Sequence, residues 1–224
     1  MSLLLVFDLD DTLYLERDFV RSGFRVVAAH ARRTLGVRGL FAAAWRRFEA
    51  GERGTILDHA LEERGVDPSR RLVRELVRVY RTHEPRLRLC PDARRLLRRP
   101  PAETTLAVIS DGPLPAQRGK VRALGLRRLV SAIVLTGEWG PRFAKPHPRA
   151  FRMLERRFRM SGADCAYVGD NPAKDFDAPL DLGWTAIRLR RPQGLHAHLA
   201  GPSVPEVRSC DELDGWLPRP RARA

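Results

Sequence analysis

Three aspartates, Asp8, Asp10 and Asp11, stand within four positions near the start of the chain, directly after the apolar run Leu3 to Phe7. A short continuous run of Leu and Val is typical of a strand buried in a parallel sheet. Such a strand places the residues that follow it at the carboxyl edge of the sheet, where open α/β folds bind ligands. Carboxylates this close repel one another unless a cation lies between them. Taken alone, the pattern fits either a turn with a helix cap or a cation-dependent site.

Two later strands are also expected to end in polar residues. The run Thr105 to Ile109 precedes Ser110-Asp111-Gly112, and the run Ala166 to Val168 precedes Gly169-Asp170-Asn171. Because the carboxyl ends of parallel strands lie at one edge, these groups should converge with the first three acids. A hydroxyl followed by glycine at such a point suits a phosphate, since backbone N–H groups there can point at an anion. Ser110 alone would indicate only a turn, but beside the acids it indicates a phosphate site.

Lysine is rare in this chain. Lys120, Lys145 and Lys174 are the only lysines, and every other basic side chain with a permanent charge is arginine. Lysine offers a compact charge on a thin stem, which arginine cannot imitate in a tight site. Lys145 also lies in a loop stiffened by Pro146 and Pro148. We therefore predict that Lys145 faces the acids rather than solvent.

The segments DLDDTLY, ISDG, AKPHP and GDNPAKD follow one another in the order of the motifs of haloacid-dehalogenase-like (HAD) hydrolases. The chain resembles that family over almost its whole length, in the sub-group with a helical cap after the first motif. The resemblance implies that Asp8 is the nucleophile and Asp10 the acid/base. It implies that the phosphoryl group is bound by Ser110, Asp111, Gly112 and Lys145. Asp111 stands where the family often has Asn, and only its backbone N–H is expected to be used. It implies that Asp8, the backbone carbonyl of Asp10 and Asp170 bind Mg²⁺. Asp175, Thr12 and Asn171 are then expected to support these ligands without binding the metal.

Hydrophobic periodicity predicts an α/β protein with an insertion. From Thr104 onward strands and helices alternate, which predicts a doubly wound parallel sheet, a Rossmann-like core. Residues 16–88 show helical spacing and are too long for a loop. We therefore predict a core of residues 1–15 and 89–224 with an α-helical cap of residues 16–88. Three boundaries are also predicted: a cap helix starting at Asp67-Pro68, a helix Ala173 to Leu182, and a final helix Cys210 to Leu217. The end, residues 219–224, is expected to fray.

Composition limits the partners and the compartment. The net charge is +14 and the pI near 11.1, but arginines are spread along every segment, so we do not expect a nucleic-acid partner. No apolar run is long enough to span a bilayer. Cys90, Cys165 and Cys210 form no CxxC pair, which is typical of free thiols in a reducing cytoplasm. Asp177 is expected at the surface, and neither His196 nor His198 is expected to bind metal.

The resemblance implies a Mg²⁺-dependent phosphomonoesterase that hydrolyses a small phosphorylated metabolite through an aspartyl-phosphate. Asp10 argues against dehalogenation, because a halide leaving group needs no proton. The absence of lysine from residues 16–88 argues against a phosphonatase that uses a cap Schiff base. A sugar phosphomutase on the same scaffold is the alternative enzyme, and a basic binding module is the alternative outside catalysis. Nucleotide monophosphates and sugar phosphates are both open as substrates, and a monomer and a homodimer are both open as assemblies.

Overall fold

The computed structural model describes residues 2–218 and divides into two compact units. One unit is a core built from both ends of the chain, up to Arg17 and again from Leu87. The other is an inserted unit, Asp18–Arg86. The sequence placed the inserted segment at residues 16–88.

A six-stranded parallel sheet with strand order β3-β2-β1-β4-β5-β6 forms the centre of the core. Val6 of β1 lies opposite Ala107 of β2 on one side and Tyr167 of β4 on the other. The chain order reverses between β1 and β4, which is where open parallel sheets bind ligands. This topology confirms the predicted doubly wound sheet. The strands are β1 (Leu3–Phe7), β2 (Thr104–Ser110), β3 (Ala132–Leu135), β4 (Cys165–Gly169), β5 (Thr185–Leu189) and β6 (Glu206–Val207).

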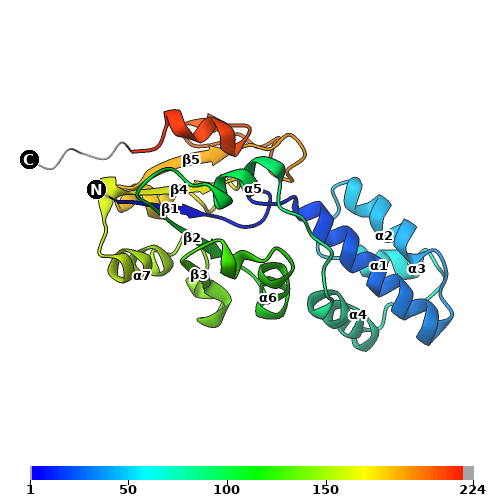
Figure 1. Ribbon diagram of the computed structural model, residues 1–224. Coiled ribbons are helices and arrows are strands. Elements are labelled where there is room, and N and C mark those ends of the chain that lie inside the picture. Colours follow the sequence, from blue (N-terminus) through cyan, green and yellow to red (C-terminus); the bar gives the residue numbers. More distant parts are fainter. Residues whose placement is uncertain (1, 219–224) are drawn as a thin grey trace, which may run out of the picture. The chain divides into compact units, whose positions relative to one another are not determined.

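Burial on both faces explains why β1 is an unbroken apolar run. Leu4 and Val6 pack in one cluster with Phe151 and Leu154 of α7. Helix α7 covers one side of the sheet and α5 lies on the other (Figure 1). Every residue of β1 is buried, so neither face of the strand tolerates a polar side chain before its end. The core helices are α5 (Pro91–Arg98), α6 (Leu114–Ala123), α7 (Arg149–Phe158) and α8 (Asp177–Asp181).

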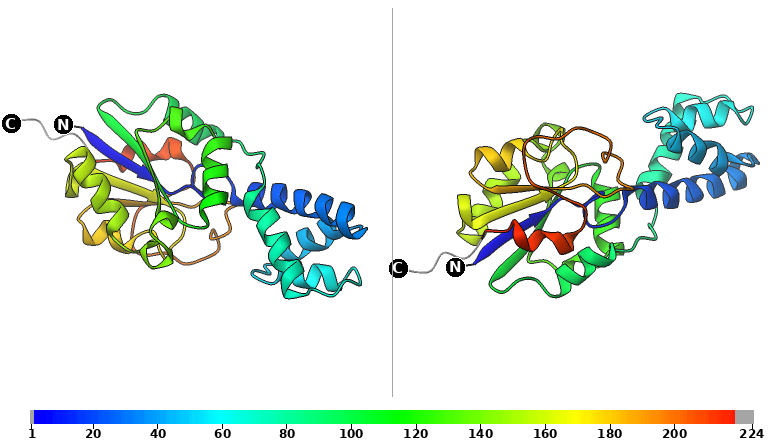
Figure 2. Two further views of the ribbon diagram at one scale, coloured as in Figure 1. Left: turned by 90° about the horizontal axis from the view of Figure 1, so that it is seen from below. Right: turned by 90° about the horizontal axis from the view of Figure 1, so that it is seen from above.

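The inserted unit is helical, as Figure 2 shows. Its helices are α1 (Glu16–Leu35), whose first two residues belong to the core, α2 (Leu40–Glu49), α3 (Ile56–Glu62) and α4 (Arg70–Thr82). Gly23 permits α1 to approach Tyr80 of α4, because a Cβ at Gly23 would lie 2.5 Å from the Tyr80 ring. Phe24 also packs on Tyr80, with ring centroids 5.7 Å apart. Aromatic contacts therefore make up much of the small interior of this unit.

Three predicted helix boundaries are wrong, and local contacts explain the first two. Helix α4 begins at Arg70 rather than at Pro68, because Ser69 is its N-cap and the Ser69 hydroxyl accepts a hydrogen bond from Leu72 N at 3.3 Å. The helix predicted from Ala173 to Leu182 is only α8, since a loop stabilised by Asp175 occupies its first part. The final segment is a 3-10 helix, Cys210–Gly215. The predicted fraying of residues 219–224 lies outside the described residues.

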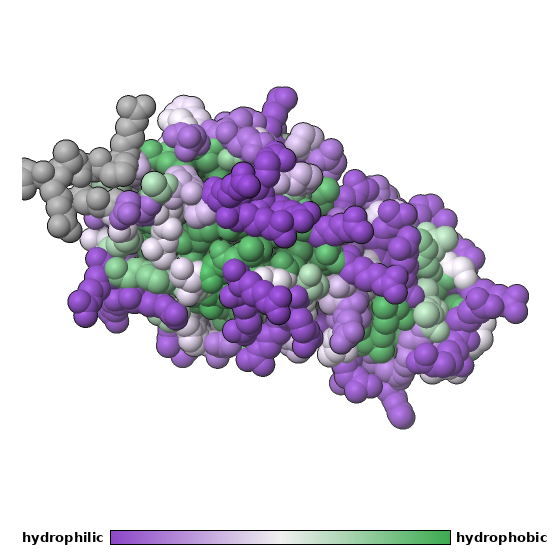
Figure 3. Space-filling model, in the orientation of Figure 1, coloured by the Kyte–Doolittle hydropathy of each residue, from purple (hydrophilic) through white to green (hydrophobic). Residues whose placement is uncertain are grey.

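The described surface is rich in hydrophilic side chains, which are distributed across the visible face of both units (Figure 3). No helix within residues 2–218 is both long and apolar enough to cross a membrane. The three cysteines are free thiols, with Cys165 and Cys210 buried.

Candidate active site

Three neighbouring strands, β2, β1 and β4, deliver the predicted residues to one edge of the sheet. Asp8 follows β1, Ser110 ends β2 and Asp170 follows β4. Asp8 N donates to Val168 O at 2.8 Å, so the β1–β4 ladder continues up to the first acid. The side chains are withdrawn from water: Asp8 is 2 % exposed, Ser110 1 % and Asp170 6 %. Polar groups this deeply buried need partners or a ligand.

Lys145 is the partner of Asp8. Its ammonium donates to Asp8 Oδ1, to Asp175 Oδ1 at 2.7 Å and to Tyr167 Oη at 2.7 Å. Burial alone would lower the pKa of Lys145, but Asp175 and Asp8 outweigh it and hold the pKa well above its usual value. Burial would likewise raise the pKa of Asp175, yet Lys145 and Lys174 keep it below the ordinary range. Lys145 is therefore a permanent cation that joins the first and fourth motifs.

The carboxylates still outnumber the positive charge available to them. Burial raises the pKa of Asp8 to about 8, although Lys145 opposes this shift. Burial also raises the pKa of Asp170. Oxygen atoms of Asp8, Asp170 and Asp175 lie within 4.8 Å of one another. Grouped carboxylates that are costly to ionise fit a hard divalent cation, which prefers oxygen ligands.

A second group, made of Asp11, Asp170 and His196, also lies within metal-ligand distances. His196 Nδ1 lies 2.9 Å from Asp170 Oδ2, and its Nε2 lies 3.2 Å from Asn171 Nδ2. Asp11, at φ 50°, accepts hydrogen bonds from Glu16 N and Leu195 N, both at 2.8 Å. The position of His196 could not be predicted from the sequence, because the loop that carries it has no regular periodicity.

The residues of the second motif form a turn around Gln117. Ser110 Oγ donates to Gln117 Oε1 at 3.0 Å. Gly112 has φ 119°, and a Cβ there would meet Gln117 Nε2 at 2.9 Å. The Asp111 carboxylate accepts from Thr136 Oγ1 at 2.8 Å and from Lys145 N at 3.1 Å. The Asp111 side chain is thus used to tie this turn to the Lys145 loop.

The supporting residues of the sequence prediction take different positions. Asn171 N donates to Asp175 Oδ2 at 2.9 Å, which fixes the carboxylate that Lys145 contacts. Thr12 Oγ1 is buried and has no hydrogen-bond partner within the described part of the chain. Its carbonyl accepts from Arg191 Nε at 2.9 Å, so the backbone of the first motif is held from the C-terminal segment.

Asp10 does not join the carboxylate group that includes Asp8. Lys120 Nζ lies 2.7 and 2.8 Å from its two carboxylate oxygens, and the Tyr14 hydroxyl donates to Oδ1. Burial would raise the pKa of Asp10, but the charge and hydrogen bonds of Lys120, together with Tyr14, hold the pKa below its usual value. Lys120 was missed from the sequence, although the rarity of lysine was a signal that pointed to it.

All three lysines contact acids at this edge of the sheet. Lys145 pairs with Asp8, Lys120 with Asp10, and Lys174 Nζ lies 3.3 Å from Asp111 Oδ2. In an arginine-rich chain this selective use of lysine matches the need for a small charge in a narrow site.

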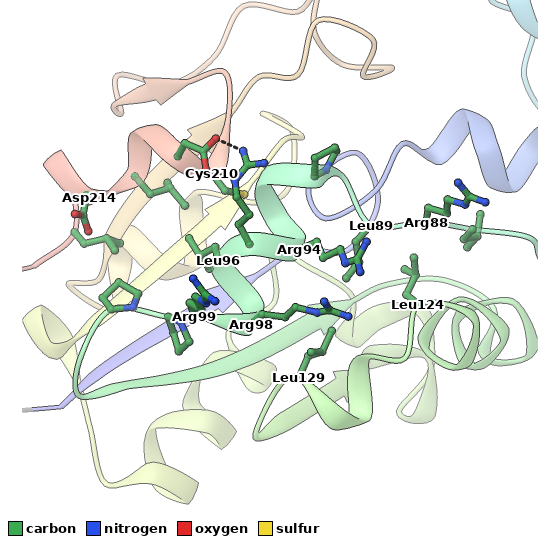
Figure 4. Close-up of a pocket in the computed structure, with 18 of the residues that line it drawn as sticks. Arg88, Leu89, Arg94, Leu96, Arg98, Arg99, Leu124, Leu129, Cys210 and Asp214 are labelled. Carbon is green, nitrogen blue, oxygen red and sulfur yellow. Dashed lines mark hydrogen bonds and ion pairs between the residues drawn. The ribbon is translucent and has the colours of Figure 1, made fainter.

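A groove of about 1130 Å³ lies beside α5, and Figure 4 shows the side chains that line it. Its walls carry Arg88, Arg94, Arg98 and Arg99, and leucines such as Leu96 contribute apolar surface. None of the predicted site residues lines it. This groove therefore does not coincide with the candidate active site.

Comparison with known proteins agrees with the motifs. The family model of the haloacid dehalogenase-like hydrolases matches residues 3–183. A phosphoserine phosphatase from Thermus thermophilus is 31 % identical over 84 % of this chain and 88 % of its own length. A glyceraldehyde 3-phosphate phosphatase from Methanocaldococcus jannaschii is 24 % identical over 83 % of each chain.

A solved structure with the same fold is the 2-haloacid dehalogenase from Pseudomonas syringae. It is 24 % identical, with a TM-score of 0.65 over 97 % of this chain and 98 % of its own. Because dehalogenases share the fold, the reaction must be argued from the residues of the site. From the matched motifs and the curated relatives, this chain belongs to the haloacid dehalogenase-like hydrolase family of enzymes.

Proposed function

We propose that the protein is a Mg²⁺-dependent phosphomonoesterase that hydrolyses a small phosphorylated metabolite. The observation that carries this proposal is the buried Asp8 carboxylate, held through Oδ1 by Lys145 and grouped with Asp170 at the end of β1. Asp10 stands two residues further on, with a carboxylate of its own. The similarity to two phosphatases supports the same reaction class.

In the proposed first step, Asp8 attacks phosphorus through the oxygen that Lys145 does not hold. The Asp8–phosphorus bond forms while the ester P–O bond breaks, and Asp10 gives a proton to the departing alcohol. In the second step, water attacks phosphorus, Asp10 takes a proton from that water, and the Asp8–phosphorus bond breaks to release phosphate. Asp10 must therefore be protonated when the first step begins, against the preference for the ionised form that its contacts with Lys120 create, and it is protonated again after the second step.

The groups around phosphorus have distinct tasks in this proposal. Lys145, Ser110 and the backbone N–H groups of Asp111 and Gly112 bind the phosphoryl oxygens, on which negative charge is spread during transfer. Asp8, the carbonyl of Asp10 and Asp170 would hold Mg²⁺, which supplies positive charge to both the carboxylates and the phosphoryl group when bound. Asp175 holds the Lys145 ammonium through a hydrogen bond of 2.7 Å to Oδ1.

Asp10 favours ester hydrolysis over dehalogenation. An alcohol leaving phosphorus needs a proton, whereas a halide leaving carbon does not. Within the first motif, Asp10 pairs with Lys120, whereas Asp8 pairs with Lys145. Free thiols are compatible with the cytoplasm, where we place the enzyme.

A phosphate-release screen tests the proposal. Purified protein is incubated with sugar phosphates, nucleotide monophosphates, phosphoserine and a 2-haloacid, each with Mg²⁺ or with excess chelator. We expect phosphate from at least one ester with Mg²⁺ and none with chelator. Halide release would contradict the reaction class, phosphate release in chelator would contradict the metal, and isomerised substrate without phosphate would indicate a mutase.

A further inference from the structure

Three side chains of the core unit contact the Asp10 carboxylate. Lys120 Nζ lies almost equally far from both oxygens, at 2.7 and 2.8 Å. The Tyr14 hydroxyl donates to Oδ1, and Gln117 Nε2 lies 3.4 Å from Oδ2. Lys120 and Gln117 both come from α6, one turn apart. One helix therefore holds both the acid of the first motif and, through Gln117, the Ser110 hydroxyl of the second.

The position of Lys120 is specialised for this contact. Its side chain is 4 % exposed, whereas the Asp10 side chain is 21 % exposed. Withdrawing an ammonium from water is costly unless a carboxylate with good geometry compensates it. The arginines on the same helix, Arg118 and Arg122, remain at the surface. The buried cation of α6 thus pairs with a carboxylate that is more exposed than the cation itself.

We propose that Lys120, with Tyr14, is a positioning residue that fixes the orientation of the Asp10 carboxylate before substrate arrives. This rests on the proposed function, in which Asp10 exchanges a proton with the leaving alcohol and with water. An unrestrained aspartate samples several rotamers, and a small misplacement of a proton donor is costly to the rate. Lys120 itself touches neither phosphorus nor the leaving group. Its loss therefore affects only the steps in which Asp10 takes part.

The test compares Lys120→Met with Asp10→Asn on two esters by rapid-quench kinetics. An alkyl phosphate needs a proton on its leaving group, whereas p-nitrophenyl phosphate does not. We expect Lys120→Met to lower the rate of the first step at least about 10-fold on the alkyl ester, within the roughly 10²–10⁴-fold contribution of a general acid. On the aryl ester the first step should be nearly unchanged, with a burst of nitrophenolate and an accumulated phosphoenzyme.

A double-mutant cycle supplies the decisive comparison. In an Asp10→Asn background, Lys120→Met should have no further effect on the alkyl ester, because the residue it positions is already absent. Lys120→Arg should restore part of the loss by restoring the charge. Arg122→Met, which removes an exposed cation from the same helix, is the matched control and should behave as wild type.

Tyr14→Phe keeps the proposal testable if Lys120→Met fails to fold. It removes only the hydroxyl that donates to Asp10, and it should shift the two esters in the same direction by a smaller factor. Equal losses on both esters for these variants, or additive losses with Asp10→Asn, would overturn the proposal by indicating general damage. Failure of the proposed function would look different, since wild type itself would then release no phosphate from either ester.

Discussion

Charge compensation is the main feature of the site at the scale of single residues. Lys145 contacts Asp8 and Asp175 at once, and both carboxylates are almost completely buried. Burial nevertheless raises the pKa of Asp8 to about 8. One lysine is therefore too little charge for the Asp8 carboxylate, and an additional cation would ease its ionisation.

Asp8→Asn should abolish turnover and leave the fold intact. The amide nearly matches the carboxylate in shape, but it cannot form the aspartyl-phosphate. We expect less than about one hundredth of the wild-type rate, a loss of at least ~2.7 kcal/mol in transition-state stabilisation. Steady-state phosphate release measures the rate and circular dichroism measures the fold. Asp181→Asn, at an exposed position of α8, is the control. A folded Asp8→Asn enzyme with more activity than this would show that Asp8 is not the nucleophile.

Sequence reasoning reached some of these residues and not others for a physical reason. Strand ends follow from local apolar runs, so Asp8, Ser110 and Asp170 could be brought together from the pattern alone. Lys120 lies in the middle of a helix, and His196 lies in an irregular loop. Their contacts with Asp10 and Asp170 depend on how α6 and that loop pack on the core, which no local pattern encodes.

The end of β4 shows how an element sets the position of a side chain. The turn after β4 returns Asp175 over Gly169, and a Cβ at Gly169 would lie 2.6 Å from the Asp175 carboxylate. Asp175 Oδ2 accepts from Asn171 N across the same turn. This turn replaced the first part of the helix that periodicity predicted from Ala173. The contacts of Asp175 with Lys145 and with Asn171 N outweigh local helix propensity here.

Gly169→Ala should displace Asp175 and weaken catalysis more than stability. A shift of about 1 Å in a positioning group can lower a rate roughly 10²-fold. We therefore expect a fall of that order in kcat. Gly215→Ala is the control, because a Cβ there meets nothing within 4 Å. Kinetics and thermal melts of both variants provide the measurement. Wild-type kcat in Gly169→Ala would mean that the turn tolerates the methyl group and does not fix Asp175.

At the scale of the whole molecule, buried arginines join distant parts of the core. Arg191 donates to Thr12 O at 2.9 Å and forms two bonds to Asp92, at 3.2 and 3.0 Å. Asp92 also accepts from Cys210 N at 2.6 Å. The Arg191–Asp92 ion pair thus joins three parts of the core: the backbone at Thr12, helix α5 and the C-terminal segment at Cys210. Hydrophilic side chains cover much of the face seen in Figure 3, whereas Arg191 lies inside the core in a buried ion pair with Asp92.

Asp92→Ala should destabilise the protein by about 3 kcal/mol at pH 7, since it leaves a buried guanidinium unpaired. The pKa of Asp92 is lowered in the folded state: burial alone would raise it, but the Cys210 N–H and Arg191 outweigh that effect. The stabilisation from Asp92 is therefore present above its unfolded pKa of about 3.9 and is lost as pH falls through the folded value. Urea unfolding at pH 7 and near pH 3 should show the difference from wild type shrinking with acid.

The exposed pair Arg95–Asp211 gives the control for this measurement. Asp211 is 53 % exposed, so Asp211→Ala should cost less than about 1 kcal/mol at pH 7. Equal losses in the free energy of unfolding for the two substitutions would contradict a stabilising role of the buried Asp92–Arg191 pair.

The core chain departs and returns at neighbouring points. Cys90 N donates to Leu13 O at 2.9 Å, and the inserted unit, Asp18–Arg86, lies between these residues in the sequence. The inserted unit thus begins and ends near two core residues, Leu13 and Cys90, that are hydrogen-bonded to each other. A short linker in place of residues 18–86 would leave the strands of the sheet connected. A different insert would attach to the core at the same two points, next to Leu13 and Cys90. The catalytic scaffold can in this way exchange its accessory module during evolution or by engineering without redesigning its strand order.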